Sequence, residues 1–375
     1  MIKFGHCGKE SVDSEVKKMK IHFSRLLSLR LYWIAGAALM WFAVPASSVT
    51  AQERASSSEQ WEVPRTVFGH PDLQGNWTNA TLTPFERPAG WERGLTQQEV
   101  AEIEQGQAEL VARKAEASDP NRPPPPEGGT HPVCIDGPTS CYNEFYREPG
   151  DRVAVVNGEF RSSLVTNPSN GRVPSLTSEG RRRIDDSRAL SGQFGAYDHP
   201  EVRPLAERCI VSFGSSAGPP MLPNYWYNNN YTIVQNADYV MIMAEMVHDV
   251  RIIRLGEPRS LPTNVRPYFG DSRGWWEGNT LVVETKNLNP EHAFRGVPPS
   301  EDLKVIERFT RVDKESIVYE FTIDDLTTYT EVWGGEVPFT RLDGQVYEYA
   351  CHEGNYSLPN VLGGARYQEK NEVGR

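Results

Sequence analysis

The chain has 375 residues, and its 50 Asp and Glu outnumber its 39 Lys and Arg, so the formal charge at pH 7 is −11. Nucleic acid and anionic membrane surfaces repel such an acidic protein, and no basic cluster offsets the charge, so neither is expected as a partner. No Walker-type loop, G-x-S-x-G elbow or dinucleotide fingerprint occurs, which argues against nucleotide cofactors and serine hydrolysis. We expect no cofactor and no bound metal.

The first 51 residues have the pattern of a secretory signal peptide. Basic residues at 17–30 precede the apolar run LYWIAGAALMWFAV, and Val49 and Ala51 place small side chains where signal peptidase needs them. The run is shorter than the roughly 18 apolar residues of a membrane span, so we expect cleavage after Ala51 and no membrane anchor. Met19 is an alternative start. The predicted location is periplasmic or secreted.

The mature chain would keep 32 of the basic and 47 of the acidic residues, a formal charge of −15. It would also keep four of the five cysteines, an even number that predicts two disulfides in an oxidising compartment. We favour Cys134 with Cys141, which closes a short loop, and Cys209 with Cys351, which joins two distant segments. A metal site is the weaker alternative because no C-x-x-C spacing is present.

After the signal peptide (1–51) we expect a polar leader (52–70), then a region of strand, helix and loop (71–230) that packs on a barrel, and then an antiparallel β meander with a C-terminal helix (231–375). The strand of the second region contains Gly75-Asn76-Trp77. Thr96 and Glu99 have capping-box spacing and predict a helix over about 97–117. A Pro-rich loop follows, and SEGRRRIDDSRAL predicts a second helical segment.

From about residue 230 the sequence predicts a succession of strands joined by short turns. In SIVYEFTID the alternate residues Ile317, Tyr319, Phe321 and Ile323 share one apolar face, which is typical of a sheet packed on one side. We also expect YVMIMAEMVHDVRIIRL to form one long strand, QVYEYACHE to form the last strand, and a short C-terminal helix capped by Ser357 to follow. Closure removes the exposed edges of a meander, so we predict a mainly β fold, an antiparallel up-and-down barrel with helical decoration, with a β-sandwich as the alternative.

The Gly75-Asn76-Trp77 strand, the meander and the C-terminal helix together resemble a lipocalin or calycin-type barrel. More specifically, GDSRGWWEGNTLVVET (270–285), ERFTRVD (307–313), YEYACHEGNY (347–356) and the NNNY and EMVHD segments resemble a group of uncharacterised exported bacterial proteins. That resemblance covers nearly all of the mature chain. It implies a Gram-negative periplasm and implies no catalytic residues.

His248 and Asp249 lie in the apolar segment AEMVHDVRI. On an uninterrupted strand they point to opposite faces, so they cannot act as a dyad, and His248 would lie inside the barrel with Val250 and Ile252. A desolvated imidazole suits acid–base catalysis, but the interpretation we favour is a core histidine bonded to a backbone carbonyl or a Tyr hydroxyl. Glu245 and His248 would also face opposite ways, which argues against a shared metal.

His352 and Glu353 would lie at the rim of the barrel, where loops often carry function, so His352 is a second candidate proton shuttle. A loop histidine with a solvated neighbour explains the pair equally well. Arg273 lies among glycines and tryptophans and is a candidate charge stabiliser, or alternatively the partner of an acid that pins a hairpin. Asp324 and Asp325 end a strand in a pattern typical of a turn.

Candidate substrate-binding residues are aromatic or amide side chains near predicted loops. They are Trp275, Trp276, Tyr231 and Asn230. The sequence therefore predicts a pocket for a hydrophobic small molecule, acted on by acid–base chemistry as in a lyase, isomerase or hydrolase. A binding protein without catalysis and a structural domain with a filled interior are the alternatives, and the oligomeric state is not predicted.

Overall fold

The computed structural model describes residues 61–115, 147–212, 218–224, 227–256 and 259–372. The expected signal peptide, residues 52–60 of the polar leader, the Pro-rich loop and the Cys134–Cys141 pair lie outside these residues. Residues 60–375 cluster as one compact unit.

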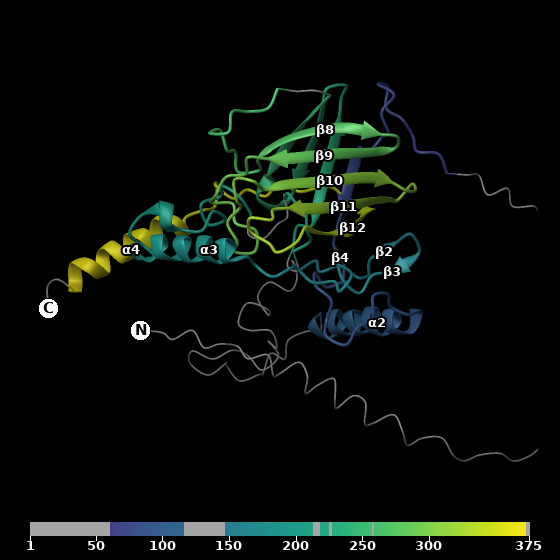
Figure 1. Ribbon diagram of the computed structural model, residues 1–375. Coiled ribbons are helices and arrows are strands. Elements are labelled where there is room, and N and C mark those ends of the chain that lie inside the picture. Colours follow the sequence, from purple (N-terminus) through teal and green to yellow (C-terminus); the bar gives the residue numbers. More distant parts are fainter. Residues whose placement is uncertain (1–60, 116–146, 213–217, 225–226, 257–258, 373–375) are drawn as a thin grey trace, which may run out of the picture. The chain divides into compact units, whose positions relative to one another are not determined.

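Nine strands of this unit close into a β-barrel (Figure 1). They are β1 (Gly75–Thr78), β5 (Asn230–Gln235), β6 (Tyr239–Ala244), β7 (Val250–Leu255), β8 (Asp271–Glu277), β9 (Thr280–Lys286), β10 (Lys304–Arg311), β11 (Ser316–Asp324) and β12 (Trp333–Arg341). The strands follow one another around the barrel in this order, and pairing of β1 with β12 closes it. The prediction of a mainly β fold with a barrel is confirmed.

One junction of the barrel differs from a purely antiparallel meander. β7 and β8 pair in parallel, through Arg254 with Arg273 and Leu255 with Gly274, whereas the other neighbouring strands are antiparallel. The long connection between β7 and β8 allows this, because a parallel pair cannot be joined by a tight hairpin. Three short strands lie outside the barrel order: β4 (Val165–Asn167) pairs with β12, and β2 (Val155–Val156) pairs with β3 (Glu159–Phe160).

The structure contains the three predicted helices, α2 (Gln97–Lys114), α3 (Ser178–Ser191) and α4 (Ser357–Glu372). The capping box of α2 is present, since the Thr96 side chain accepts from the backbone of Glu99 and the Glu99 carboxylate accepts from the backbone of Thr96. For α4 the predicted cap is corrected. The Asn355 carboxamide oxygen, rather than Ser357, accepts from the Leu358 backbone N–H at 3.4 Å.

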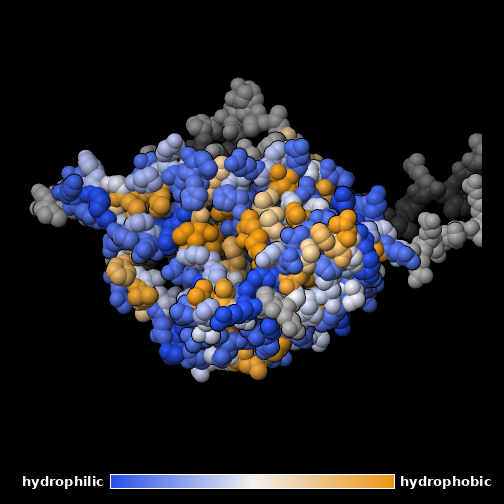
Figure 2. Space-filling view, turned by 90° about the horizontal axis from the view of Figure 1, so that it is seen from above, coloured by the Kyte–Doolittle hydropathy of each residue, from blue (hydrophilic) through white to orange (hydrophobic). Residues whose placement is uncertain are grey.

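The core is the inside of the barrel. The predicted inward set of β11 is confirmed: Ile317, Tyr319, Phe321 and Ile323 are all at most 4% exposed. They pack with aromatic residues of neighbouring strands, for example Phe309 and Phe339 around Tyr319. The outer surface carries apolar side chains in small patches among polar ones (Figure 2). No helix within the described part of the chain is long and apolar enough to cross a membrane.

The expected long strand at 239–255 is in fact a hairpin. β6 ends at Ala244, a turn of 3-10 helix spans Met246–His248, and β7 begins at Val250. The chain reverses because Val247 and His248 adopt positive φ angles of 59° and 49°, which neither residue type signals in a sequence. Beyond the turn the faces are exchanged: Arg251 is 2% exposed, whereas Ile252, expected inside, is 51% exposed.

A second expected strand, QVYEYACHE, is also absent. β12 ends at Arg341, and residues 342–356 contain no strand. β12 already pairs with β11, β1 and β4, so no partner strand remains for this segment beside it.

One end of the barrel, which we call the pocket end, is formed by the loops 245–249, 287–303 and 325–332. These loops leave β6, β9 and β11, which all finish at the same end of an up-and-down arrangement. The segment 218–229 enters β5 there as well. The candidate site lies at this end.

Candidate functional site

His248 and His352 lie side by side at the pocket end, although 103 residues separate them in the chain. Their ring centroids are 6.4 Å apart, and the ring planes are inclined by 32°. Both side chains are exposed to solvent. The structure therefore brings together the two histidines that the sequence analysis selected, which no pattern in the sequence could show.

His352 is held in place by the residues on either side of it. Cys351 forms a disulfide with Cys209, with a Cα–Cα distance of 5.8 Å, which confirms this predicted pairing. The Asn355 carboxamide donates to the backbone carbonyl of Glu207 at 2.7 Å. These two contacts fasten the 351–355 turn to the segment 207–209 and so fix where His352 presents its ring.

The expected positions of His248 and Asp249 are reversed. The prediction that His248 lies inside the barrel is wrong, because the turn at 246–248 directs it to solvent, whereas Asp249 is only 6% exposed. The Asp249 carboxylate accepts a hydrogen bond from the Ser212 backbone N–H at 3.1 Å. Burial raises the pKa of Asp249 to about 7. The hydrogen bond from Ser212 and the nearby charge of His248 act against that rise. A carboxyl group that titrates near neutrality thus lies next to the histidine pair.

Two further carboxylates lie at this end and share one amide. The Asn230 side chain donates to Glu245 at 2.7 Å and to Glu148 at 3.3 Å, and the backbone N–H of Tyr347 also donates to Glu245. Burial raises the pKa of Glu148, and the charge of Glu245 raises it further. Asn230, predicted to contact a ligand, is 8% exposed and serves as a bridge between these acids.

The other predicted ligand contacts are separate from the histidine pair. Tyr231 is fully buried in the core, where its ring stacks on Phe339 at 5.1 Å. Trp275 lies on the outer face of β8 and donates to Glu277 at 2.9 Å. Trp276 packs against the core, with its ring stacked on His70 at 5.3 Å.

Arg273 is likewise not part of the histidine site. Its guanidinium binds Glu284 on the neighbouring strand through Nε and Nη2, at 3.0 and 2.6 Å. In register it lies opposite Arg254, at the end of β7 that is remote from the turn carrying His248. The arginine pins two strands together on the outside of the barrel, as the structural alternative predicted. Glu353 is exposed beside His352.

A pocket opens at the pocket end, and its lining includes neither His248 nor His352. It contains about 490 Å³ of space not filled by atoms, which includes open solvent at its mouth. Its walls are mostly apolar and come from the loops and from the ends of β10 and β11. The lining residues are Gly218, Pro219, Pro220, Leu288, His292, Phe294, Val297, Pro298, Pro299, Leu303, Val305, Ile323, Asp325, Thr328 and Tyr329.

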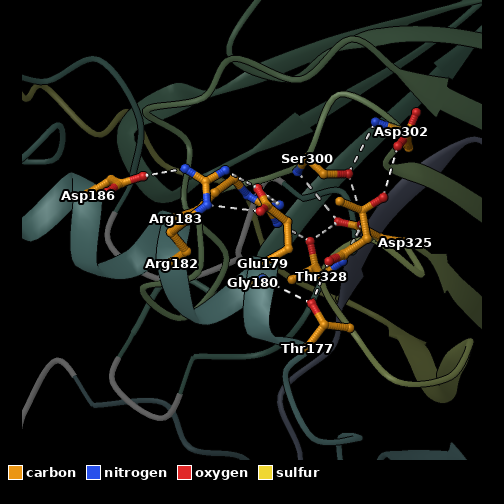
Figure 3. A network of polar contacts seen from close by, with 11 residues as sticks. Thr177, Glu179, Gly180, Arg182, Arg183, Asp186, Ser300, Asp302, Asp325 and Thr328 are labelled. Carbon is orange, nitrogen blue, oxygen red and sulfur yellow. Dashed lines mark hydrogen bonds and ion pairs between the residues drawn. The ribbon is translucent and has the colours of Figure 1, made fainter.

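One wall of the pocket is a saturated polar network around Asp325 (Figure 3). The Asp325 carboxylate accepts from the backbone and hydroxyl of Ser300 at 3.4 and 2.7 Å, and from the backbone and hydroxyl of Thr328 at 3.0 and 2.5 Å. Arg183 of α3 in turn donates to the Thr328 hydroxyl. The interpretation of Asp325 as a turn residue agrees with these bonds, which hold the 325–328 loop against α3.

Two polar side chains of the pocket, His292 and Tyr329, were not selected from the sequence. Burial lowers the pKa of His292, and its Nδ1 lies 2.6 Å from the backbone carbonyl of Tyr268. Burial also raises the pKa of Tyr329 to about 12. Both residues lie in loops without strand periodicity. The only signal in the sequence is the group of prolines around His292, which indicates a loop of restricted conformation.

Among the described residues, no group of three or more His, Cys, Asp or Glu side chains is placed to hold a metal ion. The chain matches no protein-family model, and no curated protein is significantly similar to it.

Proposed function

We propose that the protein is an exported enzyme that carries out acid–base chemistry on a small, fairly hydrophobic molecule, with His248 and His352 as the proton-transferring groups. The observation that carries the proposal is the convergence of these two imidazoles, from separate loops, at the end of the barrel where an apolar pocket opens. Histidine is the side chain best suited to exchange protons near neutral pH.

A pair of imidazoles can act on one substrate in complementary roles. One neutral ring accepts a proton from the substrate while the other, protonated, donates one to a neighbouring atom, which is the requirement of lyase, isomerase and hydrolase reactions. The disulfide of Cys351 supports His352, and the buried Asp249 lies directly after His248. Arg273, Trp275 and Trp276 have no part in this proposal because their contacts lie elsewhere on β8.

The same proposal includes export through a signal peptide that is cleaved after Ala51, and a periplasmic or secreted location. The Cys209–Cys351 disulfide supports this, since such bonds persist in oxidising compartments. We also propose that the barrel is of lipocalin type. The up-and-down order of β5–β12 supports that assignment, and the parallel junction between β7 and β8 would be a variation on it.

The test is a substrate screen with purified mature protein and a panel of small lactones, esters, epoxides and β-hydroxy ketones, in which product formation is followed by mass spectrometry. For any substrate turned over, His248→Gln and His352→Gln should each reduce kcat/KM by about 100-fold or more. His199→Gln is the matched control, because His199 is an exposed histidine in the segment that follows α3. Turnover within threefold of wild type in the folded double variant would refute the proposal.

A binding protein without turnover is the second candidate, and the apolar pocket favours it. Apolar walls with a few polar groups are the usual composition of a small-molecule site. In that case neither the wild type nor the histidine variants would convert any panel compound, and the substitutions would alter only ligand affinity or protein stability.

A further inference from the structure

We infer that the pocket binds a small neutral molecule with one hydroxyl group on an apolar body, such as a phenol or a short alcohol, and that His292 and Tyr329 bind this hydroxyl. This goes beyond the proposed catalysis, because neither residue belongs to the histidine pair.

His292 can offer a ligand only a hydrogen-bond acceptor. A backbone carbonyl has no proton to donate, so the Nδ1 atom that lies 2.6 Å from the Tyr268 carbonyl must carry the hydrogen. Burial favours the neutral ring, which leaves a lone pair on Nε2. Nε2 makes no hydrogen bond to any described residue. The Phe269 ring packs edge-on against the His292 ring and helps to orient it, with 5.6 Å between the ring centroids and 86° between the ring planes.

Tyr329 offers the complementary donor. Its side chain is 5% exposed and packs edge-on against Trp333 at 5.6 Å, so its position is set by the core. The phenol remains protonated at neutral pH, and within the described part of the chain its hydroxyl has no hydrogen-bond partner. A ligand hydroxyl is the simplest group that satisfies both residues, since it donates to a lone pair and accepts from an O–H.

The walls restrict the remainder of the ligand to an apolar body of limited size. Pro219, Pro220, Pro298 and Pro299 have no backbone N–H, so these four wall residues offer no main-chain donor. The other walls are aliphatic or aromatic, among them Leu288, Phe294 and Ile323. The roughly 490 Å³ of empty space includes open solvent at the mouth, so the ligand can be no larger than a single ring or a short chain.

Asp325, which also lines the pocket, offers a ligand no further acceptor. It is 2% exposed, and its two oxygens already accept four hydrogen bonds. Burial and the charge of Asp325 raise the pKa of Tyr329, whereas the charges of Arg183 and Arg295 act against that rise. The polar recognition of a ligand therefore falls to His292 and Tyr329.

The test compares phenol with toluene on the full mature chain by isothermal titration calorimetry at pH 7.5. We expect phenol to bind about tenfold more tightly than toluene, the value of one or two hydrogen bonds. Tyr329→Phe and His292→Leu should each reduce phenol affinity toward that of toluene and leave toluene binding unchanged. Toluene binding thus reports that the pocket of each variant is intact.

The variants His248→Gln and His352→Gln should bind phenol as the wild type does, which separates this inference from the proposed catalysis. Equal affinities for phenol and toluene would overturn the inference, as would phenol binding that survives both pocket substitutions. Absence of phenol binding at 10 mM would overturn it as well.

Discussion

Arg251 and Glu307 form a bidentate ion pair inside the barrel, with Nη1–Oε1 and Nη2–Oε2 distances of 3.0 and 2.6 Å. Their side chains are 1% and 0% exposed. The Tyr319 hydroxyl donates to the same carboxylate at 2.9 Å and accepts from the Met221 backbone N–H at 2.8 Å. Met221 directly follows Pro219 and Pro220 of the pocket wall, so this buried network also holds that part of the wall in place.

Removal of one charge of this pair should be strongly destabilising. Glu307→Gln leaves the Arg251 guanidinium buried without its counter-ion, and we expect it to lower the free energy of unfolding by about 3–5 kcal/mol in urea denaturation. The double variant Arg251→Met with Glu307→Leu should lose less, because no buried charge remains. Glu277→Gln, which breaks an exposed pair with Arg308, should have no measurable effect. A double variant less stable than Glu307→Gln would contradict this account.

The Cys209–Cys351 disulfide should contribute to both stability and the site. It closes a loop with a sequence separation of 142, so its reduction increases the entropy of the unfolded chain. We expect Cys209→Ser with Cys351→Ser to lower the free energy of unfolding by about 2–5 kcal/mol. Thermal unfolding with and without reductant measures this effect in the wild type. A reductant that leaves the wild-type midpoint unchanged while the bond is shown to be open would count against it.

Asp249 should make stability depend on pH. Its pKa is raised from 3.8 to about 7, so the native state keeps this proton to higher pH than the unfolded chain does. The associated stability is therefore fully present below about pH 4 and is lost as the pH rises through 7. Asp249→Asn mimics the protonated form and can still accept from Ser212. We expect it to match the wild type at pH 4 and to be more stable at pH 8, by on the order of 4 kcal/mol.

The free energy of unfolding of both proteins, measured from pH 4 to 8, checks this prediction. The difference between the two proteins isolates Asp249 from other titrating groups. A difference that stays constant across this range would show that Asp249 titrates as in the unfolded chain.

Gly335 should not tolerate a side chain. A Cβ atom there would lie 2.0 Å from the backbone oxygen of Leu164, where β4 joins β12 at a bulge. We therefore expect Gly335→Ala to separate β4 from the barrel and to lower the melting temperature by several degrees. Gly106→Ala in α2 is the control, since nothing lies within 4 Å of its added Cβ and alanine favours helix. Equal melting temperatures for both variants would contradict the prediction.

The barrel could be predicted because its signals are local. Alternation along β11 identifies the inward face, short turns identify neighbouring strands, and Thr96 with Glu99 identifies the start of α2. The hairpin at 245–249 could not be predicted, since Val247 takes a positive φ angle that β-branched residues rarely adopt. That single turn decides that Arg251 is inside and His248 outside.

The candidate site was only partly predictable for a related reason. His248 and His352 could be selected as residue types in suggestive segments, but their proximity depends on the turn at 246–248 and on the loop 342–356, both expected as strand. His292 and Tyr329 were missed because their significance depends on unpaired polar atoms in a pocket formed by loops far apart in the sequence.

The most direct test of the central claim is a double-mutant cycle on His248 and His352, with kcat/KM measured on the best substrate from the screen. Residues that act as one catalytic unit are strongly non-additive. We therefore predict that each Gln variant loses about 100-fold or more and that the double variant loses little beyond either single one. Losses that simply multiply, or single variants as active as His199→Gln, would contradict a shared acid–base site.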